Sequence, residues 1–210
     1  MAAHVAPTVD RSDPLIIPNS THHIGLSIRG ELKLFFADGE TLDCADVKGM
    51  SAVRSSDEVQ VLPDGRPSIR VTRLMTHFHS NETGLLIQQN PARPNFGRLT
   101  GINPGGVESL LPADVTFDQY LLLSLRGKLY INFEPLVMAA NGITEFPPIG
   151  VTFLSQTATL FYDVSRLPGG ITARDAGDVP ASLALASQSV CGSHLTHYID
   201  MPAEGAAGAA

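Results

Sequence analysis

Cysteine is scarce in this sequence, which has only two among its 210 residues. Cys44 and Cys191 lie far apart, and neither belongs to a Cys-x-x-Cys pair. That spacing excludes the usual zinc-ribbon and thioredoxin-like sites. In a reducing compartment two free thiols are the expected state, with a disulfide between the two distant residues as the alternative.

Basic residues are also few and scattered. Fourteen Lys and Arg stand against 21 Asp and Glu, which gives a formal net charge of -7. A protein that binds nucleic acid needs clustered cations to neutralise phosphates. The groupings found here, such as Arg70 with Arg73 or Arg93 with Arg98, are small and interspersed with apolar residues. The sequence therefore disfavours a nucleic-acid partner.

Long apolar runs are missing as well. The strongest run, Tyr120 to Leu125, is far shorter than the roughly 20 residues that span a bilayer as a helix. Residues 1-10 contain neither a basic leader nor a continuous apolar run, so they do not resemble a secretory signal. We therefore expect no membrane partner and a cytoplasmic location.

Several catalytic and nucleotide-binding signatures are absent too. The sequence contains no GxSxG, GxGxxG, HExxH, phosphate-binding-loop or EF-hand pattern. Gly105-Gly106 and Gly169-Gly170 each follow a proline, which is typical of turns. Nucleotide-dependent chemistry is accordingly disfavoured.

Alternation of apolar and polar residues, in contrast, is abundant. It predicts a strand from Ile24 to Phe36, a tight turn at Asp38-Gly39 and a return strand through Leu42 and Cys44. A second hairpin is predicted over residues 115-133, with its turn at Arg126-Gly127. Because Tyr120 and Leu122 make the second face of this hairpin apolar as well, we expect it to be covered on both sides in a two-layer body.

Further short strand candidates, separated by Pro and Gly turns, fill most of the remaining chain. This pattern predicts an all-β, mostly antiparallel fold, either a β-sandwich or a β-barrel, with at most one or two short helices. Residues 180-190 fit a helix or a last strand, and a helix is slightly favoured. We expect one domain over residues 21-202, an extended or disordered arm over 1-20, and a disordered tail over 203-210.

Four of the seven histidines form two close pairs, His77 with His79 and His194 with His197. On a strand, residues i and i+2 project from the same face, so His77 and His79 could bind one metal ion. Glu82, or the second pair after folding, could complete a site for zinc, iron or manganese. Otherwise these are surface histidines, and the sequence identifies no other cofactor.

The segment His77-Phe78-His79 followed by Glu82 resembles the first metal motif of the cupin family, which implies these three side chains as metal ligands. The motif has a glycine where Val71 stands, and only two residues separate His79 from Glu82. No second cupin motif follows Pro168-Gly169-Gly170. The resemblance thus covers only these few residues.

Asp118 and Tyr120 belong to the second hairpin and form another candidate site. A buried Asp118 with a shifted pKa could act as a general acid or base, and Tyr120 could line the same pocket. Alternatively, Asp118 is an edge carboxylate that accepts hydrogen bonds from the backbone. With Glu82, these residues are the candidate catalytic groups.

Three functions remain open. The first is a small-molecule enzyme that holds a metal through His77 and His79. The second is a metal-free barrel that binds a hydrophobic ligand or acts as a cyclase or isomerase, with Asp118, Tyr120 and Arg73 orienting the ligand. The third is a structural module without catalysis that forms a homo-oligomer.

Overall fold

A computed structural model describes the backbone of residues 20-202 and the side chains of residues 24-193 except 57 and 107. The predicted all-β, antiparallel fold is confirmed. The expected tail and all of the expected arm except Ser20 lie outside the described residues. The strands are β1 (Ser20–Phe36), β2 (Thr41–Val61), β3 (Pro67–Ser80), β4 (Leu85–Gln89), β5 (Asn95–Gly101), β6 (Ala113–Gln119), β7 (Leu121–Leu125), β8 (Lys128–Ile131), β9 (Leu136–Ile143), β10 (Thr152–Ser155), β11 (Thr159–Asp163) and β12 (Leu183–Pro202). The three longest strands are β2, β12 and β1, with 21, 20 and 17 residues.

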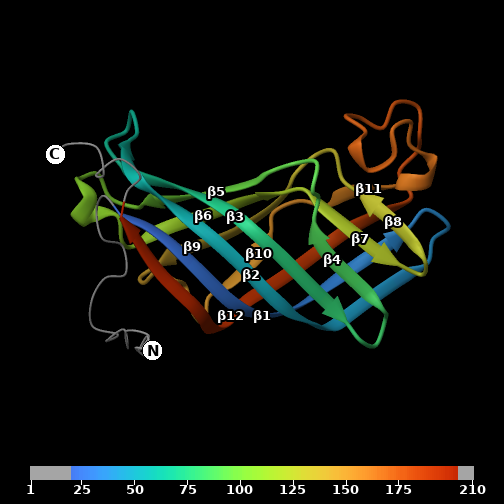
Figure 1. Ribbon diagram of the computed structural model, residues 1–210, viewed down its shortest axis with the longest axis horizontal. Coiled ribbons are helices and arrows are strands. Elements are labelled where there is room, and N and C mark those ends of the chain that lie inside the picture. Colours follow the sequence, from blue (N-terminus) through green and yellow to red (C-terminus); the bar gives the residue numbers. More distant parts are fainter. Residues whose placement is uncertain (1–19, 203–210) are drawn as a thin grey trace, which may run out of the picture.

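The strands close into a barrel because β1 pairs with both β2 and β12. Four long strands, β12, β1, β2 and β3, run along the whole barrel, as Figure 1 shows. At one end the ring is completed by β4, β7, β8 and β11, and at the other end by β5, β6, β9 and β10. Each end is therefore an antiparallel ring of eight strands, the size at which an interior is filled by side chains or holds one small ligand.

Several short strands follow one another after a brief break. At these breaks, the buried side-chain amides of Asn95 and Asn132 form hydrogen bonds with the backbone. Tyr120 separates β6 from β7, and its amide N–H donates to Oδ1 of Asn95 at 2.7 Å. Asn132 accepts from the amide of Leu121 at 2.7 Å and donates through Nδ2 to the carbonyls of Gln119 and Glu134 at 2.9 and 2.8 Å. These side chains satisfy backbone groups that would otherwise be buried without partners.

Period-two alternation directs one face of each strand into the barrel. Leu121, Leu123 and Leu125 of β7 face inward, as predicted, and each is at most 1% exposed. They pack with Leu34 and Ile87 and fill the ring to which β7 belongs. This end of the barrel is a conventional hydrophobic core.

The predicted covering of the second hairpin's outer face takes an unexpected form. Leu122 packs in a separate apolar cluster with Ile131 and Leu167, and the latter belongs to the segment between β11 and β12. This segment contains two single-turn 3-10 helices, η2 (Val164–Arg166) and η3 (Gly170–Thr172), and a further one, η1 (Val107–Ser109), lies between β5 and β6. It projects at one end of the barrel (Figure 1), so the second layer is a loop and not another sheet.

The helix favoured for residues 180-190 is wrong, because β12 begins at Leu183. Leu183 and Leu185 face the core, whereas Ala184 and Ala186 are half-buried on the other side. Pairing with β1 and β11 supplies backbone hydrogen bonds along this segment. Tertiary pairing therefore overrides the helix propensity of its alanines.

A β-bulge in β3 changes which residues point inward. Met75 pairs with Ala52 of β2, but Arg73 pairs with the next residue, Val53, which leaves Leu74 as an extra residue. Before the bulge the odd-numbered residues face the interior, ending with Arg73, and after it the even-numbered residues do, beginning with Thr76. One extra residue shifts the alternation by one position, as expected for a bulge.

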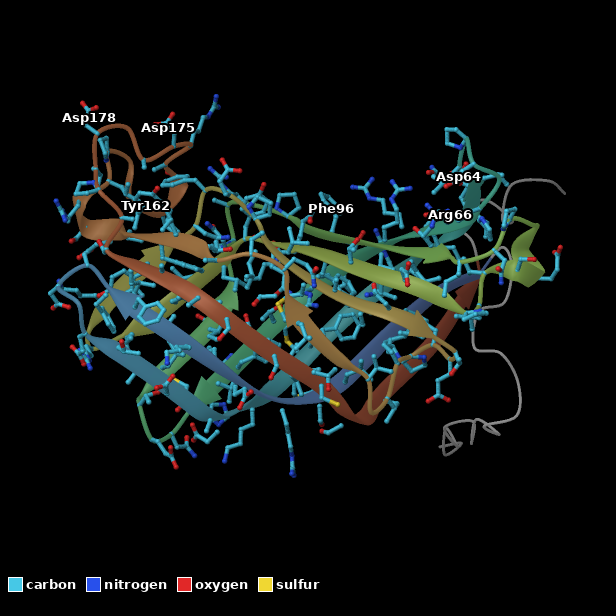
Figure 2. All side chains as sticks on the ribbon, turned by 180° about the vertical axis from the view of Figure 1, so that it is seen from behind. Asp64, Arg66, Phe96, Tyr162, Asp175 and Asp178 are labelled. Carbon is cyan, nitrogen blue, oxygen red and sulfur yellow. The ribbon has the colours of Figure 1, made fainter. Side chains whose placement is uncertain are left out.

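Two of the connections lie at opposite ends of the barrel. Figure 2 shows Asp64 and Arg66 in the β2–β3 turn at one end, and Asp175 and Asp178 in the η3–β12 segment at the other. Cys44 and Cys191 are free thiols, as expected. Among the described residues, no helix has the length and apolar character needed to cross a membrane.

We expect Asn132→Ala to lower the free energy of unfolding by about 3 kcal/mol, because three backbone groups lose their buried partners at once. Urea unfolding followed by circular dichroism measures this change. Asn81→Ala, on the exposed β3–β4 turn, is the control and should change the value by less than about 0.5 kcal/mol. Equal losses in the two variants would contradict the role assigned to Asn132.

Candidate functional site

A cavity lies inside the barrel, in the half built by β5, β6, β9 and β10, with about 40 Å³ of space open to molecules the size of water. Its wall is mostly apolar, and none of its residues is acidic. Three elements contribute most of it: β1, β6 and the loop between β9 and β10. The lining residues are Ile24, Leu26, Ile28, Ser51, Val53, Arg73, Phe78, Val115, Phe117, Gln119, Met138, Phe146, Pro147, Pro148, Phe153, Val190 and Gly192.

The loop of residues 144-151 forms one side of this cavity. Phe146, Pro147 and Pro148 line it, and the amide of Gly150 donates to the carbonyl of Gly192 in β12 at 2.8 Å. A bridge between Ile149 and Gly192 holds the loop against the same strand. The loop therefore connects β9 and β10 across the wall of the hollow half of the barrel.

Phe117 lies at the centre of the cavity wall because its neighbour across the sheet is a glycine. A Cβ at Gly97 would lie only 2.4 Å from Cδ1 of Phe117, so the ring fills the space that a side chain would need. The ring centroid of Phe117 also lies 5.8 Å from that of Phe153 and 4.6 Å from the guanidinium carbon of Arg73. Gly97 thus positions an aromatic surface on which a cation rests.

Arg73 is the one charged residue of the cavity wall, and it is only 7% exposed. Its Nη1 donates to Oγ1 of Thr76 at 3.4 Å, and its Nε has no hydrogen-bond partner in the described part of the protein. No described carboxylate forms an ion pair with it. Burial lowers the pKa of Arg73 to about 10, which still leaves the guanidinium protonated at neutral pH.

Other buried polar groups accompany Arg73. Asn95 of β5 is its partner across the sheet, and Gln119 lines the cavity from β6. Nδ2 of Asn95 and Oε1 of Gln119 are buried without a hydrogen-bond partner among the described residues. Ser51 lines the cavity beside Thr76, its partner in β3. A band of polar side chains therefore crosses an otherwise apolar interior.

The predicted metal residues His77 and His79 lie outside this cavity. They lie on β3 after the bulge, where odd-numbered residues face outward, so His77 is exposed and His79 is half-buried. Their ring centroids are 6.4 Å apart. Without the bulge, unbroken alternation would have placed both imidazoles on the inner face with Val71 and Arg73. The bulge therefore separates the pair from the cavity.

The second histidine pair is not brought close to the first by the backbone register. His77 pairs with Met50, Met50 with Ser27, and Ser27 with His194, so three strand spacings, about 14 Å, separate the two histidine positions. The side chains of His194 and His197 lie outside the described residues. Within the described part, no group of three His, Cys, Asp or Glu side chains could hold a metal ion. Metal binding through these residues stays a prediction.

The candidate catalytic residues also lie away from the cavity. Asp118 is exposed on β6, so the burial considered for it is not found, and Glu82 is exposed in the β3–β4 turn. Tyr120 is half-buried, and its ring lies 5.1 Å from the guanidinium carbon of Arg93. None of the three lines the cavity, and their catalytic roles stay predictions.

Sequence reasoning placed Arg73 in a ligand pocket but missed Gln119 and Asn95. The signal for Gln119 was present, because it continues the inward series of Val115 and Phe117 at period two. A polar residue in an inward apolar series is a candidate for binding. Asn95 is the first residue of β5, a short strand that sequence patterns did not predict, and so it carried no comparable signal.

Comparisons with known proteins bear on the fold. No family model matches the sequence, and no curated protein matches it. Among solved structures, DynF from the dynemicin biosynthesis pathway of Micromonospora chersina matches with a TM-score of 0.65 at 16% sequence identity. The match covers 91% of this chain and 94% of DynF. At this identity the likeness establishes a shared fold over nearly the whole of both chains.

We expect Arg73→Met to raise the free energy of unfolding by about 1-3 kcal/mol in the absence of ligand. The lowered pKa of Arg73 means that burial in the folded protein disfavours the charged guanidinium. This charge therefore lowers the free energy of unfolding at neutral pH, and the loss is relieved only as the pH rises above about 10. Urea unfolding at pH 7 measures the gain. The control is Arg70→Met on the exposed side of the same strand. If Arg73→Met instead lowers the free energy of unfolding by more than Arg70→Met does, the charge of Arg73 is already stabilised in the protein without ligand.

Proposed function

We propose that this protein binds an apolar small molecule inside the barrel without the help of a metal. The observation that carries the proposal is the lining of the cavity, because a mostly apolar wall with a few polar groups, here Arg73 and Gln119, is typical of small-molecule sites. The opposite half of the barrel has a tightly packed interior, where Leu121 and Leu123 are fully buried. The contrast between the two halves supports a binding role for the hollow one.

The shared fold with DynF favours the same proposal. DynF is a protein of the dynemicin biosynthesis pathway, and its chain and this one superpose over nearly their whole lengths. A role in the metabolism of a small molecule is therefore a reasonable starting point for this protein. Binding, rather than a particular reaction, is the function we propose.

The two other functions are less well supported by the geometry. A metal-dependent reaction in the cavity would need ligands there, whereas His77, His79 and Glu82 face away from it. Homo-oligomer formation stays a prediction that light scattering can test. A cyclase or isomerase activity is compatible with the cavity, but Asp118 and Tyr120 do not line it and so would not supply its acid or base.

The test introduces phenylalanine at two positions on opposite faces of one strand. Val115 is 1% exposed and lines the cavity, whereas Thr116 beside it is exposed on the outside. Titration with the uncharged fluorescent probe N-phenyl-1-naphthylamine measures binding to the wild type, Val115→Phe and Thr116→Phe. We expect Val115→Phe to weaken binding about tenfold or more, since displaced contacts with two CH₂ groups are worth about 1.6 kcal/mol.

Thr116→Phe should bind the probe as the wild type does. Equal affinities in all three proteins would place the probe outside the barrel and contradict the proposal. Failure of the wild type to bind this probe, together with no thermal stabilisation by a panel of hydrophobic compounds, would also sink it. Circular dichroism spectra show whether each variant retains the β-sheet fold.

A further inference from the structure

We propose that the ligand carries a carboxylate group, which Arg73 binds inside the barrel. This inference rests on the proposed function and specifies the chemistry of the ligand at the same cavity. It starts from an imbalance of charge: the cavity wall contains one cation and no anion. A buried guanidinium without a counter-charge is costly, and an anionic ligand would remove that cost on binding.

The surroundings of Arg73 fix its orientation. Thr76 holds Nη1 from the same strand, and the guanidinium lies over the ring of Phe117, with 4.6 Å between its carbon and the ring centroid. Nε remains without a partner. A planar guanidinium held on one edge and on one face presents its remaining donors to a ligand, and carboxylate oxygens fit such donors well.

The neighbouring unpaired groups strengthen this assignment. Nδ2 of Asn95, the cross-strand partner of Arg73, is a second buried donor without an acceptor. Native proteins leave few buried donors unsatisfied, so these two donors on adjacent strands are candidates to bind an acceptor group of a ligand. A carboxylate has two oxygens with several acceptor positions and can satisfy more than one donor.

The outer face of β3 provides an internal comparison. Arg70 is exposed and lies over Phe96, with 3.9 Å between the guanidinium carbon and the ring centroid. Figure 2 shows Phe96 on the outside of the barrel wall. The same strand therefore carries two arginine-phenylalanine pairs, one in water and one in the cavity. Only Arg73, the inner one, experiences the desolvation that makes an anionic ligand favourable.

The experiment varies the charge of a ligand on a constant apolar body. The ligands are 1-naphthaleneacetate, its methyl ester and 1-naphthaleneethylamine, together with 6-phenylhexanoate and its methyl ester as a more flexible pair. Isothermal titration calorimetry at pH 7 gives the affinity of each ligand for the wild type, Arg73→Met, Arg73→Lys and Arg70→Met. The full chain is used throughout.

In the wild type, we expect each carboxylate to bind about tenfold or more tightly than its ester, and the amine to bind weakest of the naphthyl series. Arg73→Met should abolish the preference for the carboxylate while still binding the ester. Arg73→Lys should keep part of the preference, because it retains the charge but loses the planar donors. Arg70→Met should behave as the wild type.

Each alternative outcome is decisive. Equal affinities of acid and ester in the wild type, or a preference for the amine, overturn the inference but leave the proposed function standing. Failure of every ligand to bind overturns the proposed function as well. If Arg73→Met does not fold, the charge series on the wild type and on Arg73→Lys still decides the question.

Discussion

The pairing of β1 with β12 is the interaction on which the rest of the structure depends. These strands of 17 and 20 residues are the first and last of the described chain, and their pairing joins both ends of the sheet. Unpaired, each would be a long exposed edge open to aggregation. Joined, they enclose an interior, and only an enclosed interior can keep a guanidinium and an apolar cavity away from water. The fold and the cavity thus depend on the same strand pairing.

Much of this fold could be predicted from alternation alone. The hairpins at Ile24–Cys44 and 115-133 were evident because one face of each strand meets the core and one meets water. The last strand was harder, since its alanines favour a helix in isolation and only pairing with β1 makes it extended. Closure itself is not visible in the sequence, because it depends on contacts between residues far apart in the chain, such as Phe36 with Leu183 and Ser20 with Pro202.

The candidate site could be predicted only in part, and one residue explains much of the difference. By simple alternation, Arg73, His77 and His79 belong to one face of β3. Leu74 is an extra residue in the ladder, so Arg73 stays inside and both histidines turn outward. Nothing in the local sequence marks Leu74 as a bulge, because the bulge arises from the fit between β2 and β3. Alternation therefore places Arg73 on the inner face correctly, whereas the bulge turns His77 and His79 to the outer face, and metal binding by the two histidines stays a prediction.

The division of the barrel into a filled half and a hollow half has a consequence for how such proteins diversify. Leu34, Ile87 and Leu123 of the filled half belong to the same apolar cluster as Met138 and Val190, which line the hollow. Exchanging a residue that lines the hollow therefore changes both the shape of the cavity and the packing of the core. New chemical preferences of the cavity are thus limited to exchanges that preserve the apolar volume of the core.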